Sequence, residues 1–513
     1  MFRVQGFSVQ EKQNTDRKAK GDEVPVADPE PVEGSASKGH FRHFGHSRHF
    51  SRETLAVDEE IRKSLARIVG DENYTDRLID MVSYSYDASD HAHRPDAAVW
   101  VSDAGQVSEI LRLANKHRFP VIPRGAGTGL TGAAVPAAGG VVLDLCRMNR
   151  ILDVRIADRL VVVQPGVVYA DLEKALAPLG FFFPPDPASG KVCTIGGNAA
   201  TNAGGIRGAK YGVTRDYVLG LEVVLADGRV LRTGSGCIKS ASGYDLTRLF
   251  VGSEGTLGVI TEITLKISPR PLASTTALAM FPDLRHAGQA VSDIMHSGIV
   301  PSVLEVLDTN AIRVLREKAG VALPEGEAMI LSETDGYTQG ESAFQMDVII
   351  GIFQENNAVV IQRADSPEEA EALWQARKSV GSAAAKLRTN NVSEDVTIPV
   401  SRVPDLLTGV AAIVERHGLP FVIFGHAGDG NLHPRIMFDR SQPDQVRKVQ
   451  EAVEEIFRLT CSLGGTLSGE HGIGLAKAPF MALEHDPVSM DLMRSLKRLL
   501  DPNNILNPGK LGL

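Results

Sequence analysis

The sequence predicts an α+β protein of about three domains. Its 513 residues, of which 43% are apolar, can bury large hydrophobic cores. Short apolar segments of strand length alternate with glycine-rich loops, and several of these segments follow one another as hairpin-like pairs. Helical segments fall between them without the regular strand–helix repeat of a parallel sheet. This mixed order favours α+β over a doubly wound α/β fold.

Hydrophobic periodicity assigns most of the elements before residue 270. An amphipathic helix is expected over residues 55–69, because apolar side chains recur there at helical spacing. Further helices are expected over residues 107–117, 169–176 and 245–249. The expected strands span residues 97–101, 121–123, 140–144, 159–164, 219–225, 230–232 and 259–267.

Residues 1–54 are predicted to be a disordered extension. The segment is polar and proline-containing, and few aliphatic side chains are available to pack it. It has no continuous apolar core, which excludes a secretory signal, and its acidic residues argue against a transit peptide. A metal-binding tail is the alternative, because histidines recur there at every third position. These histidines are His40, His43, His46 and His49.

Charge and cysteine content exclude several classes of protein. The net charge is −9, which argues against nucleic acid or an anionic membrane as the main partner. The four cysteines are far apart and form no C-x-x-C pair, so disulfides, a thiolate zinc site and an iron–sulfur cluster are not expected. No apolar run is long enough to span a bilayer, so a cytoplasmic protein without a transmembrane segment is predicted.

The first glycine loop, Gly127–Gly132, matches the G-x-G-x-x-G pattern of dinucleotide-binding proteins. A strand precedes it, but Pro136 and a following pair of glycines prevent the helix that a nicotinamide-dinucleotide site requires. A P-loop is excluded because neither Lys191 nor Lys510 is followed by Ser or Thr. What remains is a loop of exposed backbone N–H groups, with the Thr128 and Thr131 hydroxyls, that can hold a pyrophosphate.

Two further glycine-rich segments strengthen this interpretation. Pro184–Pro187 precedes the run Thr194–Gly205, in which small residues alternate with amides and hydroxyls that suit a flat ligand. Gly252–Thr261 is a third glycine loop, and it continues into a strand. The alternative is three ordinary surface turns, but turns favour Asn-Gly or Pro-Asp pairs over repeated Gly, Thr and Ala. One extended dinucleotide site is therefore the favoured hypothesis.

A second type of site is indicated by Gly425–His433 together with Glu470 and His471. His426 and His433, with the carboxylate of Glu470, form the His₂Glu ligand set that suits zinc and leaves a coordination position open. His471 is a further imidazole, placed for proton transfer. The alternative is a set of solvated loop histidines, which fits one histidine better than it fits four clustered ligand-type residues.

In this order, the segments resemble the FAD-linked oxidase family, which includes D-lactate dehydrogenases, D-2-hydroxyglutarate dehydrogenase and the FAD subunit of glycolate oxidase. The resemblance covers roughly residues 60–513, ending with Asn504–Lys510. It implies a PCMH-type FAD-binding domain of two α+β subdomains, residues 55–272. It also implies an α+β substrate-capping domain with an antiparallel sheet, residues 273–513, whose last 15 or so residues return to the FAD-binding domain.

The resemblance implies non-covalent FAD, because Thr128 stands where relatives with covalent flavin have a histidine. The loop Gly125–Leu130 would hold the pyrophosphate, and Glu254 and Ile260 would meet the adenosine end. The cofactor residues that it implies are Arg124, Gly125, Gly127, Thr128, Gly129, Leu130, Pro185, Asp186, Thr194, Gly197, Asn198, Thr201, Asn202, Gly204, Gly205, Glu254, Gly258, Ile260 and Asn507.

For catalysis, the resemblance implies one divalent metal on His426, His433 and Glu470, with zinc as first choice and iron or manganese as alternatives. Oxidation of a 2-hydroxy acid removes the hydroxyl proton and a hydride from the adjacent carbon. His471 would take the proton and flavin N5 the hydride. Arg377 resembles the family's carboxylate-binding arginine, and the alternative is a surface arginine of a helix.

Substrate choice depends on departures from the dicarboxylate-oxidising members. Those members have a lysine shortly before the segment that here begins at Ser393, and Asn where this chain has Arg435. A second substrate carboxylate would therefore lack its lysine partner. D-Lactate is the favoured substrate, glycolate the second and D-2-hydroxyglutarate an alternative, whereas the role of Arg435 is left open.

No NAD fingerprint and no cluster ligands are present, so electrons must leave through a protein, a quinone or oxygen. The resemblance implies an iron–sulfur subunit or an electron-transfer flavoprotein as acceptor, peripheral membrane association through such a partner, and a homodimer as one oligomeric state. Two rival classes are a flavin enzyme without net oxidation, of the alkyl-dihydroxyacetonephosphate synthase type, and a catalytically silent FAD-binding assembly subunit. The complete His-His-Glu-His set argues against both.

Overall fold

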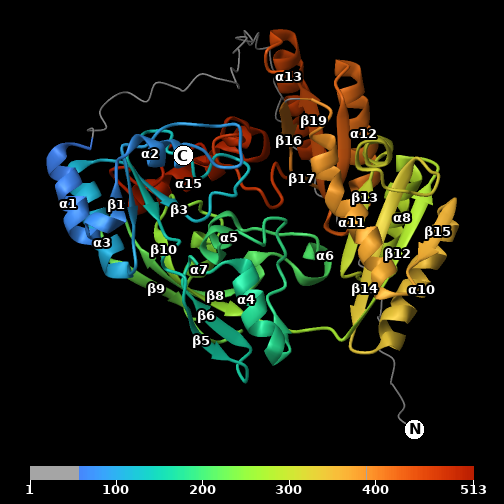
Figure 1. Cartoon of the computed structure of the whole chain (residues 1–513), viewed down its shortest axis with the longest axis horizontal. Helices are drawn as coiled ribbons and strands as arrows, with labels where there is room; N and C mark the ends of the chain where they lie inside the picture. Colours follow the sequence, from blue (N-terminus) through green and yellow to red (C-terminus); the bar gives the residue numbers. More distant parts are fainter. Residues whose placement is uncertain (1–56, 389) are drawn as a thin grey trace, which may run out of the picture. The chain divides into compact units, whose positions relative to one another are not determined.

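The structure is a computed structural model that describes residues 57–388 and 390–513 (Figure 1). The predicted extension 1–54 and its histidines lie outside the described residues. In the described part of the chain, helices alternate irregularly with four sheets, of which three are antiparallel throughout, and this confirms the predicted α+β class. Among the described helices, none combines the length and the apolar character needed to cross a bilayer.

The first sheet carries the first glycine loop at one of its edges. Its strand order is β1 (Tyr74–Thr75), β2 (Ala97–Trp100), β4 (Val141–Asp144) and β3 (Val121–Arg124), and the last three run parallel. Helices α1 (Glu59–Val69) and α3 (Ala104–His117) bury their apolar faces against it. Because β3 ends at Arg124, the loop begins at the carboxyl end of a parallel strand, where ligands commonly bind.

The second sheet is antiparallel and carries the other two glycine segments. Its order is β5 (Ile151–Arg155), β6 (Leu160–Val163), β10 (Val259–Lys266), β8 (Val218–Val224) and β9 (Val230–Gly234). Three helices share its hydrophobic core, namely α4 (Tyr169–Leu176), α5 (Ile195–Thr201) and α7 (Leu246–Phe250). The second glycine segment contains α5, and the third leads into β10, which begins at Val259.

The largest sheet has eight antiparallel strands. Their order is β15 (Val360–Arg363), β12 (Ala273–Phe281), β14 (Ala328–Gly336), β13 (Val303–Leu307), β18 (Phe421–His426), β19 (Asn431–Phe438) and β16 (Asn390–Ser393), with β17 (Val396–Thr397) also on β19. One face packs against α8 (Leu284–His296), α10 (Gln339–Glu355), α12 (Val403–His417) and α13 (Pro443–Ser462) (Figure 1). The other face packs against α9 (Thr309–Val314) and α11 (Pro367–Ala384).

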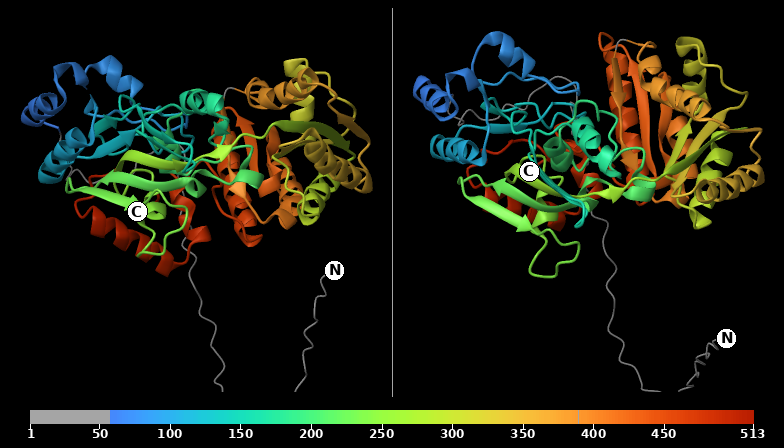
Figure 2. Two further views of the ribbon diagram at one scale, coloured as in Figure 1. Left: turned by 90° about the horizontal axis from the view of Figure 1, so that it is seen from below. Right: turned by 60° about the horizontal axis from the view of Figure 1, so that its bottom comes forward.

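The chain ends by returning to the first two sheets. After α14 (Met481–Glu484), α15 (Pro487–Leu500) lies beside the five-stranded sheet, as the red segment in Figure 2 shows. The backbone then pairs with β3, since Val121 N donates to Ile505 O at 2.7 Å and Asn507 N donates to Val121 O at 2.9 Å. We propose the division into domains at residues 272 and 273, where β12 begins.

Several short elements connect these layers. They are α2 (Leu78–Ser83), α6 (Gly208–Tyr211), the pair β7 (Phe181–Phe182) and β11 (Ser268–Pro269), and the single turns Asp71–Asn73, Ala177–Leu179, Thr214–Asp216, Leu315–Ala319, Val400–Arg402, Ala427–Asp429 and Ala478–Phe480.

Candidate active site

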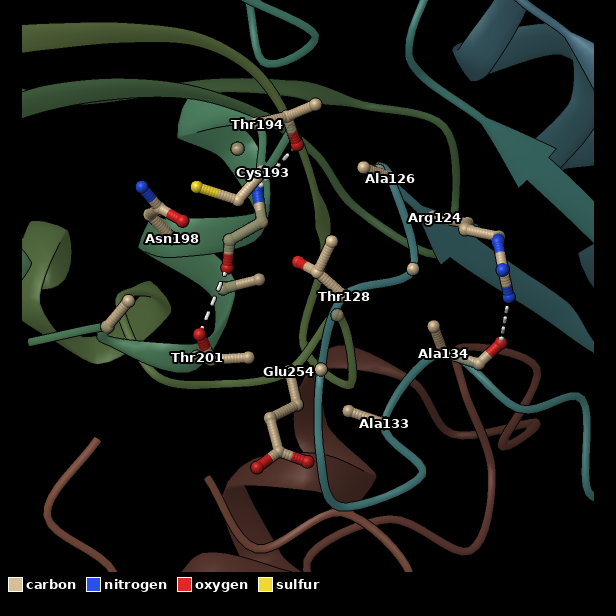
Figure 3. Close-up of a pocket in the computed structure, with 18 of the residues that line it drawn as sticks. Arg124, Ala126, Thr128, Ala133, Ala134, Cys193, Thr194, Asn198, Thr201 and Glu254 are labelled. Atoms are coloured by element: carbon tan, nitrogen blue, oxygen red, sulfur yellow. Dashed lines mark hydrogen bonds between the residues drawn. The ribbon is translucent and has the colours of Figure 1, made fainter. Parts of the chain in front are cut away.

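The three glycine segments meet around one cavity of about 410 Å³ (Figure 3). In Figure 3 the first loop, with Thr128, faces the segment of Asn198 and Thr201 across this cavity, and Glu254 lies at one end. The predicted cofactor residues that line it are Arg124, Gly125, Gly127, Thr128, Gly129, Leu130, Thr194, Gly197, Asn198, Thr201, Glu254, Gly258 and Ile260. Segments far apart in the sequence therefore form a single binding site for a large ligand.

Glycine is required where the first loop approaches α5. A Cβ at Gly125 would lie 2.3 Å from Thr194 Oγ1, and Gly127 has a φ of +69°. Thr194 is the amino-terminal cap of α5, since its hydroxyl accepts a hydrogen bond from Gly197 N at 3.2 Å. The buried Asn198 Nδ2 has no partner in the described structure, which leaves a donor available to a ligand in the cavity. These features fit a bound dinucleotide.

Six predicted cofactor residues do not line this cavity, namely Pro185, Asp186, Asn202, Gly204, Gly205 and Asn507. Their surroundings indicate that they shape the loops. Asn202 ends α5 at a φ of +55° and accepts a hydrogen bond from Arg215 N at 2.9 Å. A Cβ at Gly205 would lie 2.1 Å from Asp186 O. Cofactor contact by these residues stays a prediction.

Sequence reasoning missed other residues of the cavity wall. Ala126, Ser189 and Cys193 line it and lie inside or beside the predicted loops, so their small size in those runs was the available signal. Pro165 also lines it, from the segment after β6, and no motif marks that position.

The predicted metal ligands converge on one point. His426 ends β18 and His433 lies on the neighbouring β19, whereas Glu470 comes from the loop before α14. Glu470 Oε1 lies 3.3 Å from His426 Nε2 and 3.3 Å from His433 Nε2. The turn between the strands depends on Gly430, which has a φ of +80°. A Cβ added at this position would lie 2.0 Å from Ile398 O. Two imidazole nitrogens and a carboxylate oxygen form a donor set that could hold a divalent metal.

A buried carboxylate, Glu305 on β13, orients His426. Glu305 Oε1 accepts a hydrogen bond from His426 Nδ1 at 2.5 Å, which turns the Nε2 atom of His426 toward Glu470. Burial alone would raise the pKa of Glu305, but the charges of Arg377 and His426 outweigh it and lower this pKa to about 2. Sequence reasoning missed Glu305, although a charged residue within an apolar strand was a signal.

Arg377 lies at the site but already has a protein partner. Its Nε donates to Glu305 Oε2 at 2.5 Å, and its guanidinium carbon lies 4.7 Å from the centroid of the Phe424 ring. The predicted surface-helix alternative is wrong, because this side chain is largely buried beside the sheet. Its positive charge is compensated by Glu305.

A second buried carboxylate, Asp395, holds the loop that carries Glu470 and His471. Asp395 Oδ2 accepts hydrogen bonds from Glu470 N at 3.0 Å, His471 N at 2.8 Å and Ser468 Oγ at 2.7 Å. Asp395, His433, Glu470 and His471 also have ligand-type atoms within 4.8 Å of one another. Because Asp395 is already saturated with hydrogen bonds, we assign it to positioning and retain His426 in the candidate ligand set.

His471 lies between these ligands and the cofactor cavity. Its ring stacks on that of His433 at a centroid distance of 5.1 Å, and both His471 and Glu470 line the cavity. Burial lowers the pKa of His471 to about 4, although Asp395 opposes the shift, so the imidazole is neutral at pH 7. A neutral imidazole beside the cavity can accept a proton from a bound molecule.

Two family models match this chain. The FAD binding domain model matches residues 95–234, and the model for the C-terminal domain of FAD linked oxidases matches residues 270–511. The chain is 42% identical to glycolate oxidase subunit GlcD of Bacillus subtilis strain 168, over 89% of this chain and 97% of the relative. It is 36% identical to a probable mitochondrial D-lactate dehydrogenase of Danio rerio, over 91% of this chain and 94% of the relative.

Solved structures with the same fold are more distant in sequence. p-Cresol methylhydroxylase with substrate bound has a TM-score of 0.73 at 20% identity, covering 88% of this chain and 96% of that chain. An alkyldihydroxyacetonephosphate synthase has a TM-score of 0.67 at 20% identity, covering 90% and 87%. These likenesses support the fold. On the family models and the relatives, the chain belongs to the FAD-linked oxidases and is an FAD-binding oxidoreductase.

Proposed function

We propose that this protein is an FAD-dependent, metal-assisted dehydrogenase that oxidises a small D-2-hydroxy acid to the 2-oxo acid. One observation carries the proposal: Glu470 and His471 line the cofactor cavity, while Glu470 also meets His426 and His433. A group that can hold a metal and a group that can take a proton are thus adjacent to the expected flavin. The names of the relatives support the same type of substrate.

When bound, FAD supplies a hydride acceptor and the divalent metal, zinc by preference, supplies Lewis acidity toward a substrate oxygen. His426, His433 and Glu470 would hold the metal, and Thr128 in place of a histidine favours non-covalent FAD. His471 is neutral at pH 7 and would take the hydroxyl proton. Asp395 fixes the backbone at His471, so the imidazole is positioned before substrate arrives.

A small monocarboxylate is the proposed substrate, with D-lactate and glycolate as the two candidates. Three of the relatives are named glycolate oxidase subunits and others D-lactate dehydrogenases. Ser393 lies opposite Arg435 in the pairing of β16 with β19, and neither residue supplies the lysine expected for D-2-hydroxyglutarate. We therefore propose a substrate with a single carboxylate and not a dicarboxylate.

The reduced flavin needs an electron acceptor outside this chain. We propose an iron–sulfur subunit or an electron-transfer flavoprotein, and peripheral membrane association, if present, through that partner. The relatives named as glycolate oxidase subunits support the idea of a partner chain. A homodimer is the proposed arrangement of the isolated protein.

Anaerobic mixing with substrate tests the proposed function. The metal-loaded protein should lose its oxidised-flavin absorbance rapidly with D-lactate or glycolate, and slowly with L-lactate or D-2-hydroxyglutarate. A chelator should abolish this reduction, and added zinc should restore it. If FAD and metal are bound and none of these acids reduces the flavin, the chain is not a dehydrogenase of small 2-hydroxy acids, and the silent assembly subunit becomes the better hypothesis.

A further inference from the structure

Two arginines lie beside the candidate metal site, and only one of them has a carboxylate partner among the described residues. Arg377 pairs with Glu305, so together the two side chains carry no net charge. Arg435 donates one side-chain hydrogen bond, from Nη1 to Gly381 O at 2.9 Å. We propose that Arg435 binds the carboxylate of the substrate, an inference that rests on the proposed oxidation of a 2-hydroxy acid.

The position of Arg435 on β19 places it next to the reacting groups. His433 and Arg435 are two residues apart on the strand, so both side chains project from the same face. About 7 Å separates Cα atoms at this spacing, which keeps an anion near His433 within reach of an arginine side chain. The guanidinium carbon of Arg435 lies 5.8 Å from the centroid of the Phe424 ring, and the same ring lies 5.8 Å from that of His433.

The electrostatic state of Arg435 favours an incoming anion. Its buried Nε has no hydrogen-bond partner in the described structure, although a guanidinium has five N–H donors. A bound carboxylate would supply both the missing acceptor and the missing negative charge.

The surroundings of Arg435 leave room for a ligand. It lines a cavity of about 680 Å³ between β16, α13 and residues 88–91, and Leu130 belongs to both this cavity and the cofactor cavity. Gly381 makes space for the guanidinium, because a Cβ there would lie 3.3 Å from Arg435 Nη1.

The other cations of this cavity already have acidic neighbours. Arg440 pairs with Asp90 at 2.8 Å, and Lys477 Nζ lies 3.7 Å from Asp395 Oδ2. Arg435 is therefore the cation of the described cavity wall that has no carboxylate partner. One uncompensated charge suits one carboxylate, which is the physical basis for a monocarboxylate substrate.

A charge-specific comparison tests this role. Flavin reduction by D-lactate and by D-lactamide, its neutral amide, should be measured with the holoenzyme and with Arg435→Gln. The wild-type preference for lactate over lactamide, expressed as a ratio of kcat/KM, should fall about 10- to 100-fold in the variant. Most of that loss should appear as a higher KM for D-lactate, because the carboxylate is bound before and during the reaction. Arg435→Lys, which keeps the charge, should retain part of the preference.

Arg416→Gln is the matched control. Arg416 lies on α12, on the opposite face of the sheet, and is an exposed arginine paired with Glu455. The Arg416→Gln variant should keep the wild-type ratio of kcat/KM for D-lactate to that for D-lactamide.

The outcomes separate the two proposals. If the wild-type flavin is reduced by no 2-hydroxy acid, the proposed function fails. If the wild type is reduced and Arg435→Gln keeps the full lactate preference, the function stands and the role of Arg435 is overturned.

Discussion

Two buried carboxylates determine how the candidate catalytic side chains are held. Glu305 connects His426 to Arg377, and Asp395 receives the backbone N–H groups of Glu470 and His471. Such partners fix the orientation and tautomer of ligands and bases at little entropic cost during the reaction. Both residues are completely buried, so their charges act in a medium of low polarity.

Removing the charge of Glu305 should weaken metal retention. In Glu305→Gln the amide cannot act as an anionic acceptor for His426, and we expect metal affinity to fall by about 10- to 100-fold. Competition with a chelator measures this affinity, and the FAD content should not change. Glu333→Gln is the matched control, because Glu333 is a largely buried carboxylate of β14 that bonds to Trp374 instead of a candidate ligand. Equal metal retention in both variants would contradict the assignment.

The pKa of His471 leads to a prediction about pH. Because burial lowers this pKa to about 4, the imidazole is neutral above that pH and becomes protonated only as the pH falls through it. Stopped-flow flavin reduction should therefore be level from about pH 8 to about pH 5 and fall below that, and His471→Asn should slow it at least about 100-fold. An acidic limb centred near the ordinary histidine value would show that burial does not control this group.

The short spacing between His426 and His433 made part of the candidate metal site predictable from sequence. His426 and His433 could be paired from sequence because they flank a glycine-rich turn in one hairpin. Glu305 could not be paired with His426, because 121 residues separate them and only strand order brings them together. The same limit hides the pairing of Arg377 with Glu305, because 72 residues separate them in sequence.

At the level of elements, hydrophobic periodicity predicted helices and strands that pack in the hydrophobic cores, but it did not predict the helix α5 beside the cofactor cavity. The helix over 169–176 is confirmed as α4, and the strand over 97–101 is confirmed within one residue as β2. α5 was missed because its sequence Ile195–Thr201 contains two adjacent glycines and too few apolar residues for a helical period. The cap by Thr194 and tertiary packing of Ile195 and Ala199 stabilise it instead.

The loop from Thr466 to Lys477 is an element without regular structure that depends on Asp395. Asp395 accepts from Asn431 Nδ2 at 2.7 Å through Oδ1, and from Ser468 and the loop N–H groups through Oδ2. In Asp395→Asn the amide can accept at only one of these two positions and carries no charge, so bonds on one side are lost and the others weaken. We expect flavin reduction to slow at least about 10-fold with FAD still bound, because His471 loses its fixed position. Stopped-flow absorbance measures the rate of flavin reduction, and the flavin absorbance before mixing measures the bound FAD. Asp444→Asn, on the exposed start of α13, should change neither, and a normal reduction rate in Asp395→Asn would exclude positioning by this carboxylate.

At the level of the whole molecule, a few polar contacts connect parts of the chain that are distant in sequence. Glu254 beside the cofactor cavity accepts hydrogen bonds from Ile473 N and Gly474 N, at 2.7 and 2.9 Å. Tyr211 donates to Asp335 at 2.7 Å. The resemblance of the chain's end to the family predicted that Asn507 belongs to the cofactor region, but its contacts could not be read from local sequence.

Asn507 connects the first and third glycine loops, and its removal should loosen FAD. Its Nδ2 donates to Ala133 O at 2.9 Å and to Glu254 O at 2.7 Å, and its backbone has a φ of +41°. Asn507→Ala loses both bonds and also strains the backbone, whereas Asn507→Gly loses the bonds alone. We expect both variants to bind FAD about 10-fold more weakly in fluorescence titrations of the apoprotein, with Asn507→Ala also unfolding at a lower temperature. Wild-type FAD affinity in Asn507→Gly would show that the return of the chain stabilises the fold without shaping the cofactor site.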